Sequence, residues 1–213
     1  DQLTMRISSI SLALLSLLAL AWVSVASVQA APHTSEGHWL EDYDEGVRIA
    51  REQGKDLLVD FTGSDWCGWC IRLDSEVFEH AEWLEAAKRD FVLVKLDFPK
   101  AQAIKDKVPN PKRNEELKDR LGVTGFPSIL MVTAEGEVFG RTGYKKGGPG
   151  VYIGHMAELR AKGLKQLNAV IDLVKAYNQA TGKERRLRWE AVASHIFING
   201  IEGPGAMTCL DLI

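Results

Sequence analysis

Two cysteines that stand three residues apart, directly after a short apolar run, constrain this chain more than any other feature. Residues 57–61 (Leu-Leu-Val-Asp-Phe) are bounded by turn residues and predict a buried strand. Residues 66–70 follow with the sequence Trp-Cys-Gly-Trp-Cys, and a helix is expected from Cys67 to about Phe78. In the first turn of a helix, residues three apart lie on the same face, so Cys67 and Cys70 are close enough for a disulfide. The chain is therefore expected to run from a strand through a short loop into a helix that carries two thiols.

Cys67 is expected to be the more acidic of the two thiols. The unpaired backbone N–H groups in the first turn of a helix carry partial positive charge, which stabilises a thiolate. Asp65 acts in the opposite direction if its carboxylate lies close to the sulfur. Asp60 is a second acid of interest, because a carboxylate in the middle of a buried apolar strand is costly and often has a shifted pKa. A functional role for Asp60 is therefore favoured over that of a satisfied polar residue at a strand end.

The remaining apolar pattern predicts an α/β fold. The expected strands are residues 57–61, 91–96, 128–132 and 137–140, and the last two form a hairpin around Gly136. The expected helices are residues 38–53, 67–78, 81–88, 115–121 and 150–180, with the last one divided into two helices at Gly163. Residues 98–113 are rich in proline and lysine and are expected to form a loop or a broken insertion. This order of elements predicts helices packed around a mixed sheet.

Two ordered motifs are similar to those of the thioredoxin superfamily. Residues 58–61 followed by 66–70 resemble the superfamily's active-site signature, and residues 122–128 (Gly-Val-Thr-Gly-Phe-Pro-Ser) resemble its cis-proline loop. The glycine of residues 135–137 matches the superfamily's last hairpin, and the resemblance covers residues 38–162. It implies a thioredoxin-like three-layer α/β/α sandwich with a central mixed β-sheet, followed here by a helical C-terminal extension. It also implies a role in thiol–disulfide exchange.

The resemblance implies a role for each matching residue. Cys67 matches the nucleophile that attacks a substrate disulfide, Cys70 the thiol that resolves the mixed disulfide, and the two alternate between dithiol and disulfide. Asp60 matches the buried acid that takes a proton from the second cysteine, and Lys95 falls where some members place a lysine paired with that acid. The residues expected to contact substrate are Trp66, Gly68, Trp69, Phe126 and Pro127, with Pro127 in the cis form.

The expected activity is that of a disulfide oxidoreductase without organic cofactor or metal. Its partners are protein thiols and disulfides and a redox donor or acceptor that the sequence does not identify, and the chain is expected to be a monomer. Trp69 replaces the proline or histidine that is common between the cysteines. The direction of exchange therefore stays open, with reductase or isomerase slightly favoured over oxidase.

Two other functions fit the same cysteine pair. Two thiolates suit a soft metal, so the chain is alternatively an envelope carrier of copper or zinc. A closed zinc site has four ligands, however, and the sequence contains no second C-x-x-C motif. A non-catalytic module that holds a partner in the groove around Trp66, Trp69 and Pro127 is the other alternative. A purely structural disulfide is less favoured, because so short a loop gains little entropy on closure.

The N-terminal segment predicts export. Arg6 is followed by residues 7–28, which carry no charge, and then by Val28-Gln29-Ala30. This pattern is typical of a secretory signal peptide with cleavage after Ala30, which places the chain in the periplasm or outside the cell. The alternative is an uncleaved membrane anchor that faces the periplasm. The expected division is residues 1–30 as signal, 31–180 as the thioredoxin-like domain and 181–213 as a tail of unknown role.

Charge and the third cysteine add two limits. The chain has 26 basic and 29 acidic residues and a formal net charge of −3, which excludes nucleic-acid binding through bulk positive charge. The basic stretch 185–189 is interpreted as a solvated helix face. Cys209 is interpreted as an inert cysteine, although a leftover thiol in an exported protein can also pair with another molecule. The sequence leaves open whether the last twenty residues dock on the domain.

Overall fold

A four-stranded mixed sheet forms the centre of the computed structural model, which describes residues 39–200 and 203–210. Its strands are β1 (Asp56–Thr62), β2 (Phe91–Asp97), β3 (Ser128–Val132) and β4 (Val138–Thr142), in the order β2-β1-β3-β4. β1 runs parallel to β2 and antiparallel to β3, and β3 and β4 form the expected hairpin. The predicted mixed sheet is confirmed.

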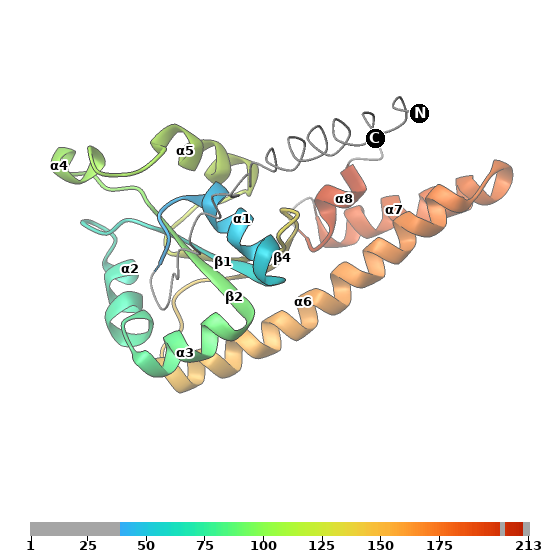
Figure 1. Cartoon of the computed structure of the whole chain (residues 1–213). Helices are drawn as coiled ribbons and strands as arrows, with labels where there is room; N and C mark the ends of the chain where they lie inside the picture. The colour runs from blue at the N-terminus through green and yellow to red at the C-terminus, as the bar shows by residue number, and fades with distance from the viewer. Residues whose placement is uncertain (1–38, 201–202, 211–213) are drawn as a thin grey trace, which may run out of the picture. The chain divides into compact units, whose positions relative to one another are not determined.

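Helices cover both faces of this sheet (Figure 1). One face packs against α1 (Tyr43–Gln53) and α5 (Pro111–Arg120), and the other against α2 (Gly68–Leu73), α3 (Ala81–Asp90) and α6 (Gly148–Gln179). Side chains alternate along β1, so Val59 enters the first core and Leu58 the second. Asp60 follows the same alternation and lies on the Leu58 side, which is the side of α2. The three-layer α/β/α sandwich is therefore confirmed.

The helix after the cysteine loop has the expected extent but changes its winding. α2 continues directly into a π-helical turn, η1 (Asp74–Phe78), so the two together end where the sequence predicted. Val77 and Phe78 of this turn are buried in the core beside Trp83. The extra residue of a π-turn thus lies one turn after the cysteines, where such turns often mark a functional site.

The first predicted helix begins five residues later than expected. The Asp42 side chain caps α1 by accepting a hydrogen bond from the Glu45 backbone N–H at 3.0 Å. Before this cap the chain is extended, and Leu40 forms an isolated parallel bridge with Val94. The apolar residues ahead of Asp42 therefore pack as an added edge segment and not as a helical turn.

The prediction of two helices divided at Gly163 is wrong, because α6 is continuous over 32 residues. Gly163 lies where this helix crosses the backbone of β4, and a Cβ atom there would stand 1.8 Å from the Phe139 carbonyl oxygen. The glycine permits a close approach between helix and strand and does not end the helix. The predicted loop at 98–113 is also partly helical, since it contains α4 (Gln102–Lys105) and the first turn of α5.

The predicted helical C-terminal extension is confirmed. α7 (Gly182–Asn199) and α8 (Ala206–Leu210) pack with the second half of α6 around a small core formed by Val170, Val174, Val192 and Cys209. Of the helices within residues 39–200 and 203–210, none is both long and apolar enough to span a lipid bilayer. The predicted signal segment, residues 1–30, lies outside the described residues.

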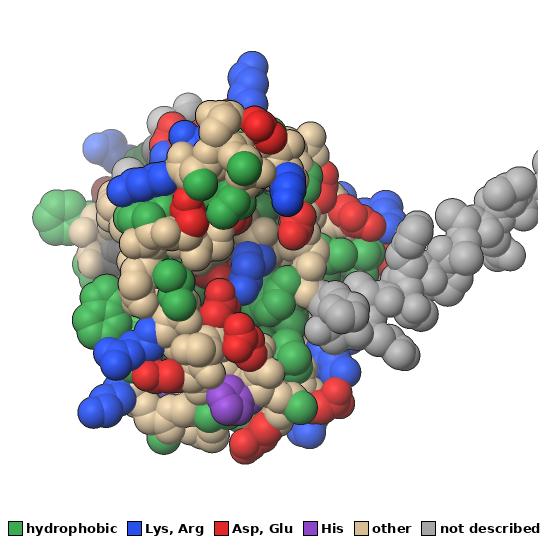
Figure 2. Space-filling model, turned by 90° about the vertical axis from the view of Figure 1, so that its left-hand side faces the viewer, with side chains coloured by type: hydrophobic (Ala, Val, Ile, Leu, Met, Phe, Trp, Pro, Cys, Tyr) green, Lys and Arg blue, Asp and Glu red, His purple; other side chains and the backbone are tan. Residues whose placement is uncertain are grey.

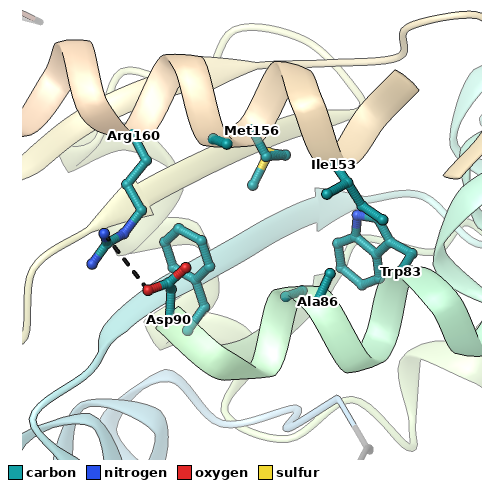
Figure 3. A pocket seen from close by; sticks show the side chains of 9 residues that line it. Trp83, Ala86, Asp90, Ile153, Met156 and Arg160 are labelled. Carbon is teal, nitrogen blue, oxygen red and sulfur yellow. Dashed lines mark ion pairs between the residues drawn. The ribbon is translucent and has the colours of Figure 1, made fainter. Parts of the chain in front are cut away.

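A small cavity of about 70 Å³ lies between α3 and α6 (Figure 3). Trp83 and Ile153 face each other at one end of it, and Arg160 forms an ion pair with Asp90 at the other, at 3.6 Å. None of the residues that line this cavity belongs to the cysteine loop. The cavity lies between two helices that pack side by side, and it is not part of the predicted cysteine site.

Candidate active site

Cys67 and Cys70 are joined in a disulfide at the first turn of α2, with their Cα atoms 5.2 Å apart. Cys67 is the N-cap of the helix, and its Sγ accepts a hydrogen bond from the Cys70 backbone N–H at 3.2 Å. Cys67 keeps 6% of its surface exposed and Cys70 only 2%. The first cysteine therefore combines a backbone N–H donor with the greater access to solvent.

Asp60 lies buried on the α2 side of the sheet, with 2% of its surface exposed. Its Oδ1 has no hydrogen-bond partner among the described residues, and its Oδ2 lies 4.0 Å from the Lys95 Nζ. Burial raises the pKa of Asp60 to about 7; Lys95 lowers it, whereas the charges of Asp74 and Asp97 raise it further. The carboxyl group is thus able to take up or release a proton near neutral pH.

The Lys95 ammonium is shared unequally between two acids. It lies 2.6 Å from Asp74 Oδ1 and 4.0 Å from Asp60 Oδ2, and it is also stacked over the Trp39 ring at 5.1 Å. The expected pairing of Lys95 with Asp60 is therefore loose, and the direct hydrogen bond goes to Asp74. Asp74 is the acid that the sequence patterns did not mark, although it follows Cys70 by one helical turn.

A cis-proline loop lies at the end of the sheet where Trp66 and the cysteines are. The Phe126–Pro127 peptide bond is cis, and Ser128, the next residue, pairs with Phe61 at the end of β1. The cis-proline loop therefore lies at the same end of the sheet as the cysteine loop. Trp66 is 39% exposed and contacts the Phe126 ring edge-on, with 5.7 Å between centroids.

Comparison with known proteins identifies this arrangement. The family model of the thioredoxin-like domain matches residues 43–148. A Chlamydia pneumoniae protein, "Disulfide bond reductase DsbH", is 33% identical over 127 residues, which are 59% of this chain and 74% of that protein. The chain belongs to the thioredoxin-like family.

Two further matches agree with this thioredoxin-like assignment. A solved structure titled "DsbH Oxidoreductase" has 30% sequence identity and a TM-score of 0.51, and the match covers 62% of this chain and 90% of that one. "Thioredoxin-related protein DsbJ" of Chlamydia pneumoniae is 28% identical over 115 residues, 53% of this chain but only 32% of that longer protein. Together with the disulfide and the buried acid, the matches make this chain a thiol–disulfide oxidoreductase.

The second tryptophan of the thioredoxin-like motif has its own aromatic partner. Trp69 is 55% exposed, and its ring contacts Tyr144 with 5.0 Å between centroids. The Tyr144 hydroxyl donates a hydrogen bond to Glu76 at 2.6 Å, and Arg72 lies over the Trp69 ring at 5.6 Å. Tyr144 belongs to the glycine-rich connection before α6, and only the tertiary fold brings it to the cysteine helix.

Asp65 is turned towards the segment after β2. Its carboxylate accepts hydrogen bonds from the backbone N–H groups of Lys100, at 2.9 Å, and Ala101, at 2.6 Å. These bonds lower the pKa of Asp65. Asp65 therefore attaches the lysine-rich insertion to the loop that leads into the active site.

Gly68, the first residue between the two cysteines, is exposed.

Within residues 39–200 and 203–210, no group of three or more His, Cys, Asp or Glu side chains is placed to hold a metal ion. Trp66 and Trp69, next to the two cysteines in the chain, are exposed aromatic side chains, and the buried Asp60 lies on the α2 side of the sheet.

Proposed function

We propose that this thioredoxin-like oxidoreductase works in the reducing direction on disulfides of other proteins, and that it does so outside the cytoplasm. The observation that carries the proposal is the position of Cys67 at the first turn of α2, with the buried Asp60 on the same side of the sheet. The name of the relative at 33% identity, a disulfide bond reductase, supports the direction. The uncharged residues 7–28 and the small residue Ala30 support export.

Cys67 is proposed as the nucleophile of the first step. Its thiolate attacks one sulfur of the client disulfide; the client S–S bond breaks, and a mixed disulfide forms between client and Cys67. The second client sulfur leaves as a thiolate and takes a proton from water. The backbone N–H that donates to Cys67 Sγ stabilises the attacking thiolate, as does the positive end of the helix dipole.

Cys70 and Asp60 are proposed for the second step. Asp60 accepts the proton of the Cys70 thiol, and the resulting thiolate attacks Cys67 Sγ. The mixed disulfide breaks, the remaining client sulfur leaves as a thiolate that takes a proton from water, and Cys67 and Cys70 form their disulfide. With a pKa of about 7, the Asp60 carboxyl is suited to hold this proton at neutral pH. The client gains two electrons, so a dithiol donor must restore the reduced enzyme.

The groove that binds the client is proposed to lie between the two aromatic walls. Trp66 and Phe126 form one wall with Pro127, and Trp69 forms the other, with the exposed Gly68 between them. In this position an extended client segment can reach Cys67 and can hydrogen-bond with the backbone of Phe126. Lys95 supports the proton transfer through its interaction with Asp60, and the enzyme is proposed to act as a monomer.

Reduction of insulin by dithiothreitol, followed by turbidity, tests the proposal with the full chain. The Cys67→Ser variant is expected to lose essentially all stimulation, while its far-ultraviolet circular dichroism stays that of the parent. A Cys67→Ser variant that stimulates reduction as well as the parent does would contradict the mechanism.

The direction is tested by equilibrating the cysteine pair with glutathione. A reduction potential near about −270 mV is expected for a reductase, whereas a value between about −180 and −120 mV would indicate an isomerase or oxidant.

A further inference from the structure

Among the described residues, three lysines that form no salt bridge lie against an aromatic residue of the proposed groove or follow one along the chain. On the Trp66 side, the Lys100 Nζ lies 4.2 Å from the centroid of the indole ring. The Lys100 backbone is fixed by Asp65, and the Trp66 indole N–H donates to the Phe98 carbonyl oxygen at 2.8 Å. Lys100 is thus held beside the groove and does not swing freely from a loop tip.

Two lysines also follow the aromatic partner of Trp69 along the chain. Lys145 and Lys146 follow Tyr144, whose ring contacts Trp69, and both are exposed. Arg72 lies over Trp69 as well, but it pairs with Glu76 at 3.0 Å, so its charge is already compensated. In the part of the chain that the structure describes, none of Lys100, Lys145 and Lys146 takes part in a salt bridge.

The acids beside Trp66 accept hydrogen bonds within the protein and keep their negative charge, and Lys100 contributes to lowering the pKa of Asp65. Both Asp65 oxygens accept backbone N–H groups of residues 100–101, and the two Asp97 oxygens accept the N–H and the hydroxyl of Ser64. The insertion adds Lys105 and Lys107, both exposed, against a single acid, Asp106. This basic composition contrasts with the formal net charge of −3 for the whole chain.

Figure 2 shows the end of the molecule where α2 and α4 lie in Figure 1. Hydrophobic side chains, Lys or Arg side chains and Asp or Glu side chains are interspersed on this face. A client segment that crosses Trp66 would meet its ring and the Lys100 ammonium beside it. Carboxylates at the ends of such a segment would find opposite charge, and ammonium groups would be repelled.

We infer that the preferred clients present carboxylate side chains on either side of their disulfide. This inference rests on the proposed function, because it names the class of disulfide that the same groove receives. The lysines act on binding and orientation of the client, and the exchange chemistry stays with the two cysteines. Electrostatic attraction of this kind acts chiefly on the rate of encounter and is weakened by salt.

Single-turnover reduction of two cyclic disulfide peptides tests the inference. The peptides are identical except that glutamates flank the disulfide in one and lysines in the other. The full chain is reduced beforehand, separated from reductant and mixed with either peptide, and the release of peptide thiols is followed by chromatography. We expect the acidic peptide to react about five- to tenfold faster at low ionic strength, with most of the difference lost near about 0.5 M salt.

Charge reversal on the walls provides the variants. Lys100→Glu combined with Lys145→Glu and Lys146→Glu is expected to abolish or invert the preference. A control variant reverses two exposed lysines on the second half of α6, Lys165→Glu and Lys175→Glu, and is expected to keep the preference. Because all five side chains are exposed, the variants are expected to fold.

The outcomes separate the two proposals. Faster reduction of the acidic peptide, lost in the wall variant and kept in the control, supports the inference. Equal rates for both peptides, or a preference that the wall variant retains, overturn the inference and leave the proposed function intact. Failure to reduce either peptide overturns the proposed function and the inference with it.

Discussion

Cys67 and Cys209 are both buried cysteines, yet they differ in their position on a helix and in the side chains around them. Cys67 begins a helix, accepts a backbone N–H and lies beside exposed aromatic rings at the end of the sheet. Cys209 has no exposed surface and packs against Val170, Val174 and Val192 in the C-terminal helical core. Burial, with a smaller contribution from Glu137, raises the pKa of the Cys209 thiol. Reactivity therefore depends on the helix terminus and on access, and not on the presence of sulfur.

The largest expected effect of this difference is on alkylation. In the reduced protein, iodoacetamide is expected to modify Cys67 at least about 10³ times faster than Cys209, because Cys209 must wait for the helical core to open. Mass spectrometry of peptides after timed quenching measures both rates in one sample. Addition of denaturant is the control, since it should bring the two rates close together. Comparable rates in the native protein would show that the C-terminal core does not protect its thiol.

Substitution of one buried side chain in each region is expected to change the free energy of unfolding in opposite directions. The folded-state pKa of Asp60, about 7, lies above the ordinary value of 3.8. Between these values the native state holds a proton that the unfolded state has released, so the free energy of unfolding falls as pH rises from about 4 to 7. Asn is neutral at every pH and avoids this loss. Asp60→Asn should therefore stabilise the oxidised protein at pH 8 by up to about 4 kcal/mol and have little effect near pH 4.

Cys209→Ser is the matched change in the C-terminal core. It places a hydroxyl among valines and is expected to lower the free energy of unfolding by about 1–2 kcal/mol, with no comparable pH dependence. Urea denaturation of both variants at pH 4 and pH 8 measures the contrast. An Asp60→Asn variant less stable than the parent at pH 8 would mean that the carboxylate is satisfied in the fold and carries no cost.

The sequence predicts the cysteine end of the molecule well because its signals are local. The apolar run with Asp60 and the spacing of Cys67 and Cys70 lie within fourteen consecutive residues of one strand, loop and helix, Leu57 to Cys70. The C-terminal half is predicted less well, since Gly163 is a glycine for a reason that lies in β4, about 24 residues earlier. The sequence alone does not distinguish a glycine that allows close packing of a helix on a strand from a glycine that ends a helix.

The same distinction explains which site residues escaped prediction. The pairing of Lys95 with Asp60 is expected from the resemblance. The closer contact of the Lys95 ammonium with Asp74 depends on how η1 orients the Asp74 carboxylate towards β2. Tyr144 reaches Trp69 from a glycine-rich connection more than seventy residues away along the chain. Contacts across such separations follow from packing of whole elements, and a single sequence does not record them.

The smallest expected effect concerns the division of Lys95 between the two acids. The charged groups that act on Asp60 are Lys95 and Asp97 from β2 and Asp74 from η1, and Tyr152 of α6 senses its charge in turn. Asp74→Asn keeps an oxygen that can accept the Lys95 hydrogen bond but removes the negative charge that raises the Asp60 pKa. The Lys95 charge then acts on Asp60 with less competition. Both changes lower the pKa of Asp60.

If Asp60 is the base in the second step, that step needs its carboxylate, so a lower pKa makes the base available at lower pH. The pH dependence of the rate of mixed-disulfide resolution is followed by stopped-flow tryptophan fluorescence. In Asp74→Asn the maximum rate should be unchanged, while the fall in rate at acid pH, the acid limb, should move down by less than about one pH unit. Asp90→Asn, which alters an acid at the far end of α3, is the control and should leave the limb in place. Asp60→Asn should remove the limb altogether. A limb that moves upward in Asp74→Asn would show that Asp74 serves mainly to hold Lys95 near Asp60, because loss of that positioning would leave the buried acid with less positive charge beside it.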